Sequence, residues 1–157
     1  MTHEPHFGTS LRRGPSQPGD LSARIEAQLR ERLEEAVDFV CLDALVQRRQ
    51  ALALPPPSAD NPRDREEFMR SVRTFLERMK AGLLPDLGAE PRAKVAAAEA
   101  APGDEDARLL GVHVVLAREL PDYWQRFEAA RAAYTAEQVA SGGERRGVLG
   151  RLFGPRG

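Results

Sequence analysis

VDFVCLDALV, residues 37–46, is apolar almost all round when it is drawn as a helix. The stretch before it continues the apolar stripe at steps of three to four residues, through Leu21, Ile25, Leu29 and Leu33. We therefore predict a helix over residues 20–54 that begins at Asp20, a good N-cap, and ends at the three prolines of residues 55–57. Its most apolar part should be buried on more than one side.

The composition also favours helices over strands. The chain has 157 residues, with 23 Ala and 18 Leu against 10 Val, 4 Thr and 1 Ile. Ala and Leu are strong helix formers, whereas strands are rich in β-branched residues. Hydrophobic residues make up 41% and charged residues 30%, which is typical of one globular domain. We predict an all-α fold, an antiparallel helical hairpin or bundle with disordered N- and C-terminal tails.

A second helix is expected over residues 61–84, with Pro62 in its first turn. Its apolar stripe is Phe68, Val72, Phe75, Leu76, Met79 and Leu83. Because the link between the two helices is short, we expect them to pair as an antiparallel hairpin.

The rest of the chain is divided by its Pro and Gly residues. Asp104 is expected to cap a helix that Pro121 kinks or breaks and that Ser141-Gly142-Gly143 stops. The expected parts are a disordered tail at 1–19, a hairpin at 20–88, an Ala-rich linker or loosely held helix at 89–103, a kinked helix at 104–140 and a basic-apolar tail at 141–157.

Charge and cysteine content indicate which partners and which cellular compartment are expected. Residues 20–140 hold 22 acidic and 17 basic side chains, the reverse of what nucleic-acid binding needs, so no nucleic-acid partner is expected. No apolar run approaches the ~20 residues of a spanning helix, so we do not expect a membrane partner. Cys41 is the single cysteine, and the first residues lack the apolar core of a secretion signal. A reduced, cytoplasmic protein is expected.

Few residues indicate chemistry directly. His113 lies on an apolar helix, which favours a hydrogen-bonded core histidine over a catalytic base. Glu31, Glu34, Glu35 and Asp38 share a helix face, as carboxylates that hold iron in bundles do. No Glu-x-x-His accompanies them, so a solvated acidic face is favoured and no metal site is predicted. Tyr123, Trp124, Phe127 and Tyr134 form an aromatic stripe, for which core packing is favoured over a platform for ring stacking.

Three segments carry a resemblance to proteins of encapsulin shells. GTSLRR, residues 8–13, resembles the targeting peptides that tether cargo inside these shells. LRERLEEAVDF, residues 29–39, is similar to the first helix of encapsulated ferritins, and RDREE, residues 63–67, to the start of their second helix. The resemblance implies an encapsulin cargo protein linked to iron storage or mobilisation, with the shell protein as its partner.

The chain departs from the ferritin pattern at the iron ligands. The first-helix glutamate of that family falls on Arg32 or Leu33, and Met69 and Arg70 stand where its second-helix histidine would be. The resemblance therefore points to the other cargo type, a flavin-binding ferric reductase with FMN as cofactor and iron as substrate. The competing hypothesis is a non-enzymatic helical adaptor that binds partners through its tails.

A flavin would need an apolar slot for its ring and cations for its phosphate. The ring could be held by Phe39 and Phe68, or by Phe75, and the phosphate by Arg70 and Arg73, which are three residues apart on one helix face. The alternative is that the phenylalanines are core residues and the arginines are solvated.

Partner binding is expected at the termini and on the first helix. The candidate docking residues are Ser10, Leu11, Arg12, Arg13, Leu149, Leu152 and Phe153. Such basic-apolar segments dock into grooves or lie on anionic membranes, and ordinary terminal disorder is the third interpretation. Residues 37–46 are too apolar for two helices to cover, so a homodimer is expected.

Overall fold

The computed structural model describes the backbone of residues 18–153 and the side chains of residues 21–142. Within these residues the fold is all-helical and contains no strand, which confirms the predicted all-α class. Its elements are α2 (Pro18–Ala51), α3 (Pro62–Leu83), the short 3-10 helix η2 (Leu84–Asp86), α4 (Ala89–Glu99), α5 (Glu105–Glu119) and α6 (Tyr123–Phe153). None of the helices so described is long and apolar enough to cross a membrane.

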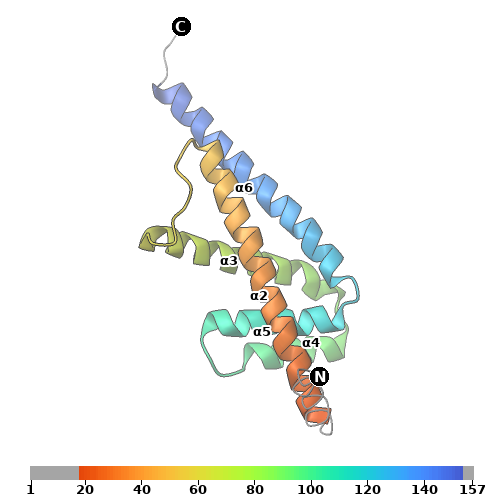
Figure 1. Cartoon of the computed structure of the whole chain (residues 1–157). Helices are drawn as coiled ribbons and strands as arrows, with labels where there is room; N and C mark the ends of the chain where they lie inside the picture. Colours follow the sequence, from red (N-terminus) through yellow and green to blue (C-terminus); the bar gives the residue numbers. More distant parts are fainter. Residues whose placement is uncertain (1–17, 154–157) are drawn as a thin grey trace, which may run out of the picture.

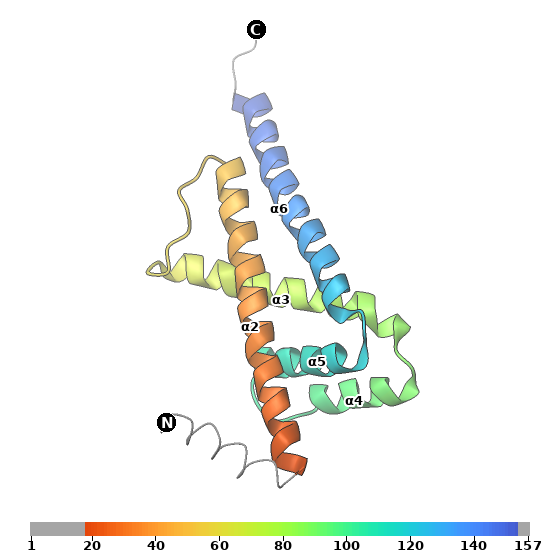
Figure 2. The same ribbon diagram turned by 45° about the vertical axis from the view of Figure 1, so that its right-hand side comes forward.

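The helices form two layers that cross steeply (Figures 1 and 2). One layer holds α2 and α6, and the other holds α3, α5 and α4. The guanidinium of Arg32 lies 4.0 Å from the centre of the Trp124 ring, and Arg48 Nη1 donates to Gln138 Oε1 at 3.2 Å. The middle of α2 thus meets the start of α6, and the end of α2 meets a later part of α6, so the two helices run parallel.

The expected hairpin of α2 and α3 is corrected by this arrangement. The two helices are in contact, but α3 crosses α2 instead of running beside it. The helix that lies along α2 is α6 (Figure 1). The physical reason lies in residues 37–46, whose apolar surface extends over more than one side of α2. Val37, Val40 and Cys41 are all fully buried, because neighbours from both layers cover them.

The Ala-rich segment at 89–103, predicted as a linker or a loosely held helix, is largely a helix. Residues 89–99 form α4, which packs against α5 with Val95 only 2% exposed. Ion pairs hold its C-terminal end and its middle, from Lys80 to Glu99 at 3.0 Å and from Lys94 to Glu119 at 3.1 Å. Its small alanines let it lie close to α5 with a single large side chain buried.

The kinked helix predicted at 104–140 is two separate helices. Asp104 caps α5 as expected, accepting from the Ala107 amide at 2.7 Å, and the chain breaks at Pro121. However, α6 does not stop at residues 141–143, since its backbone stays helical to Phe153. A Cβ added to Gly142 would lie 3.2 Å from the Arg48 carbonyl oxygen, so this glycine allows close contact with α2.

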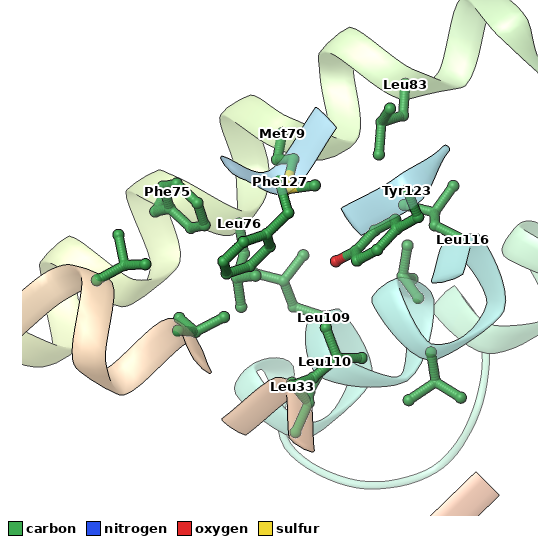
Figure 3. Close-up of a cluster of buried hydrophobic side chains, with 14 of the residues drawn as sticks. Leu33, Phe75, Leu76, Met79, Leu83, Leu109, Leu110, Leu116, Tyr123 and Phe127 are labelled. Carbon is green, nitrogen blue, oxygen red and sulfur yellow. The ribbon is translucent and has the colours of Figure 1, made fainter. Parts of the chain in front are cut away.

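The core lies where the two layers cross. Figure 3 shows Leu33, Phe75, Leu76, Phe127 and Tyr123 among its members, drawn from α2, α3 and α6. Leu109, Leu110 and Leu116 of α5 complete it. Pro18 and Gly19, which we assigned to the disordered tail, belong to α2; residues 1–17 lie outside the described residues.

Candidate functional site

His113 is a structural residue of the core. Its side chain is fully buried, with Nε2 at 2.8 Å from the Leu76 carbonyl oxygen and Nδ1 at 2.8 Å from the Tyr123 hydroxyl. A carbonyl only accepts, so Nε2 carries the proton and Nδ1 accepts from Tyr123. Burial lowers the pKa of His113 to about 4 and raises the pKa of Tyr123. The prediction of a hydrogen-bonded core histidine is confirmed.

The acidic residues of α2 stay at the surface. Glu31, Glu34, Glu35 and Asp38 are all exposed, and none forms an ion pair within residues 21–142. Burial and the nearby Glu34 raise the pKa of Asp38. In the part of the chain whose side chains are described, no group of three or more His, Cys, Asp or Glu could hold a metal ion.

Cys41 and the aromatic stripe belong to the core. Burial raises the pKa of the Cys41 thiol to about 11, so it stays protonated. Phe75 contacts Phe127 and Tyr134 edge to face, with ring centres 5.4 and 5.5 Å apart. Trp124 is half-buried beneath Arg32. Core packing of the stripe is therefore confirmed.

The four predicted flavin contacts do not meet in one pocket. Phe39 is 65% exposed on α2. Phe68 lines an apolar pocket, whereas Arg70 lines a different, polar one. Arg73 is engaged by Asp106, with Nε 2.7 Å from Oδ1. One chain therefore does not assemble the ring slot and the phosphate site that the sequence indicated.

The apolar pocket lies between α2, α3 and the loop that joins them. Its volume is about 380 Å³, and its walls are Leu42, Leu45, Pro57, Ser58, Ala59, Asp64, Arg65, Phe68 and Met69. Leu42 of α2 (49% exposed) and Met69 of α3 line it and are exposed, and the exposed Phe39 lies about one helical turn before Leu42 on α2. We name Phe39, Leu42, Phe68 and Met69 the α2–α3 apolar face.

Arg49 fixes the loop that forms one wall of this pocket. Its Nη2 donates to Asp64 Oδ1 at 2.7 Å and to Glu67 Oε1 at 2.9 Å, and its Nη1 donates to the Pro55 carbonyl at 3.2 Å. Asp64 in turn accepts from the Ser58 amide at 2.8 Å. These bonds lower the pKa of Asp64. Sequence reasoning missed this arrangement, since only the crossing of α2 and α3 brings Arg49 to the carboxylates.

The polar pocket lies between α2, α3 and α6. It measures about 160 Å³ and is lined by Leu45, Arg48, Glu67, Arg70, Ser71, Thr74, Tyr134 and Gln138. Leu45 is the one residue that it shares with the apolar pocket. The sequence pattern gave no signal for this pocket, because its lining residues come from three helices, one of which, α6, is far from the others in sequence.

The predicted docking residues at the two termini lie outside the residues whose side chains the structure describes. Ser10, Leu11, Arg12 and Arg13 lie outside the described residues. Leu149, Leu152 and Phe153 are on the helical backbone of α6, and their side chains lie outside the described set.

Comparison with protein-family models, with curated proteins and with solved structures found no match to this chain. The geometry of the two pockets and of the α2–α3 apolar face is therefore the basis for a functional proposal.

Proposed function

We propose that this protein is a non-enzymatic helical adaptor that works as a dimer, with the α2–α3 apolar face as the contact between its two copies. The observation that carries this proposal is the exposed Phe39 ring beside an apolar hollow of about 380 Å³. Exposed apolar side chains gathered around a hollow mark protein interfaces. A flavin-dependent reductase is less well supported, because Phe68 and Arg70 line separate pockets.

Charge complementarity favours a second copy as the occupant. Glu35 and Asp38 flank Phe39 on α2 and are exposed without a basic partner within residues 21–142. The Arg65 side chain stands exposed at the rim of the apolar pocket and, within residues 21–142, donates to the Ala59 carbonyl and forms no ion pair. A twofold contact repeats each pairing, so acidic residues of each copy would meet Arg65 of the other.

The shape of the face agrees with the same arrangement. Phe39 lies about one helical turn before Leu42, which lines the pocket. A twofold axis near Leu42 would carry the Phe39 ring of each copy to the pocket of the other. The contact would then bury two rings and two pockets at once.

Sedimentation of the full chain at tens of micromolar tests the dimer. The wild type should sediment with twice the chain mass, and Phe39→Asp should sediment as a monomer with unchanged helix content. Ile25→Asp is the matched control, since Ile25 is 51% exposed on the same helix, about 25 Å along α2 from Leu42. A monomeric wild type would overturn the proposal. The same degree of association in Phe39→Asp and in Ile25→Asp would also overturn it.

Residues 8–13 favour a second candidate, an encapsulin cargo. In this case GTSLRR would dock on the inner face of a shell, and a dimer would present two docking segments, which increases the apparent affinity. Co-expression with an encapsulin shell protein tests it. Deletion of residues 1–17 leaves α2 to begin at Pro18 and should abolish encapsulation. Wild-type protein that stays outside the shell would contradict this candidate.

A further inference from the structure

The polar pocket presents two arginines that lack a carboxylate partner. Arg48 donates to Gln138 Oε1 at 3.2 Å, and neither Arg48 nor Arg70 forms an ion pair within residues 21–142. The neighbouring Arg49, in contrast, is held by two carboxylates. Two guanidinium groups on different helices that line one small pocket are the usual means of binding an oxyanion.

Two hydroxyl groups add to the donors of the pocket. Ser71 Oγ and Tyr134 Oη are 2.6 Å apart, and a bond between them uses one of their two protons. Ser71 also hydrogen-bonds to the Cys41 thiol, which is protonated and can donate to Ser71 Oγ. With Ser71 in turn donating to Tyr134, the Tyr134 proton is left for a ligand. Burial raises the pKa of Tyr134, so its hydroxyl keeps its proton at neutral pH.

One acidic residue lines the pocket, and its charge is compensated. Glu67 Oε1 accepts from Arg49 Nη2 at 2.9 Å, and the same Arg49 also pairs with Asp64. Counting Arg48, Arg49 and Arg70 against Glu67 and Asp64, the pocket and its immediate surroundings carry a net charge of +1.

The size of the pocket limits the ligand. A volume of about 160 Å³ corresponds to about five water molecules. This space holds a phosphate group with a few attached atoms, and the rest of a larger ligand would lie outside it. The donors come from α2, α3 and α6, so they approach from several directions, as the oxygens of a tetrahedral anion require.

We propose that this pocket binds a phosphate group, either as free phosphate or as the monoester of a small molecule. Arg48 and Arg70 neutralise its charge, and the Ser71–Tyr134 pair donates to one of its oxygens. The site is distinct from the dimer contact, because Leu45 is the one lining residue that the two pockets share.

Calorimetric titration of the full chain with inorganic phosphate at low salt tests the site, with glycerol phosphate as a parallel monoester ligand. We expect saturable binding with a Kd of about 1 mM or below. Tighter binding of glycerol phosphate would identify the monoester as the ligand, and equal or weaker binding would identify free phosphate. No saturation with either ligand by about 10 mM would overturn the proposal.

Substitutions test whether the named residues hold the anion. Arg70→Gln should weaken phosphate binding about tenfold, because a charged hydrogen bond is lost, and Tyr134→Phe should weaken it while keeping the ring in the core. Arg63→Gln is the matched control, since Arg63 is exposed on the same helix and does not line the pocket. Equal binding by Arg70→Gln and Arg63→Gln would place the anion elsewhere and refute the assignment.

Discussion

The Nδ1 atom of His113 lies 2.8 Å from the hydroxyl of Tyr123, and the bond joins α5 to α6 inside the core. The other ring nitrogen is bonded to the Leu76 carbonyl on α3. One side chain therefore links three helices from both layers. Burial away from water disfavours the protonated, charged form of this ring. The stability of the fold is therefore sensitive to pH.

The free energy of unfolding should fall as the pH drops below 6.5. His113 has a pKa of about 4 in the folded state against 6.5 for the free side chain, so in this range the unfolded state binds the proton first. Protonation then favours unfolding, whereas well above pH 6.5, where the residue is neutral in both states, His113 adds no pH dependence. Between pH 7 and pH 5 the loss should be about 2 kcal/mol.

Urea unfolding of the wild type and of His113→Gln at the two pH values measures this effect. The glutamine can still donate to Leu76 but does not titrate, so the variant should be less stable at pH 7 and show a smaller loss at pH 5. The same loss in both proteins would assign the pH dependence to other groups, such as the surface carboxylates.

Replacing Ala53 by glycine should stabilise the fold. Ala53 has a φ of 58° in the turn that ends α2, where the Leu54 amide donates to the Arg49 carbonyl at 2.8 Å. This left-handed backbone strains a residue with a Cβ, so Ala53→Gly should raise the free energy of unfolding by about 0.5–1 kcal/mol. Ala27→Gly on the exposed face of α2 is the control and should lower it by about as much. Urea unfolding compares them, and a destabilised Ala53→Gly would contradict the strain.

Gly142→Val should destabilise the contact between α2 and α6. An added Cβ would lie 3.2 Å from the Arg48 carbonyl oxygen and 3.3 Å from the Ala51 Cβ, so a branched side chain must push the helices apart. We expect a loss of about 1–3 kcal/mol in thermal or urea unfolding. Gly82→Ala is the contrasting control, since its added Cβ meets nothing within 4 Å and should gain about 0.5–1 kcal/mol. A neutral Gly142→Val would show that close approach is not needed there.

Exchanging charges tests the proposed twofold contact. Arg65→Glu should weaken the dimer, because it sets a carboxylate against Glu35 and Asp38 of the other copy. Adding Glu35→Arg and Asp38→Arg to the same chain restores opposite charges, so the triple variant should recover most of the association. Sedimentation at a series of concentrations gives the dissociation constants. A triple variant weaker than Arg65→Glu alone would refute the pairing.

The sequence by itself determined the helical class and most helix boundaries. The stripe from Leu21 to Val46, the prolines at 55–57 and the N-caps Asn61 and Asp104 are local signals, and local backbone preferences act within a few residues. The apolar periodicity also identified His113 and the aromatic stripe as core. At Gly142 the local signal had two interpretations, because glycine is common both at helix ends and at close helix contacts. The predicted helix end there was wrong, since α6 continues to Phe153.

The tertiary structure alone decided which helices meet. It set α2 parallel to α6 rather than antiparallel to α3, because the apolar surface of residues 37–46 is wide enough for several partners and the sequence does not rank them. The same crossing brings Arg49 to Asp64, and Arg48 to the pocket that Arg70 and Tyr134 also line. Such sites depend on contacts between residues up to about ninety positions apart, for example Arg48 and Gln138, and no local pattern encodes them.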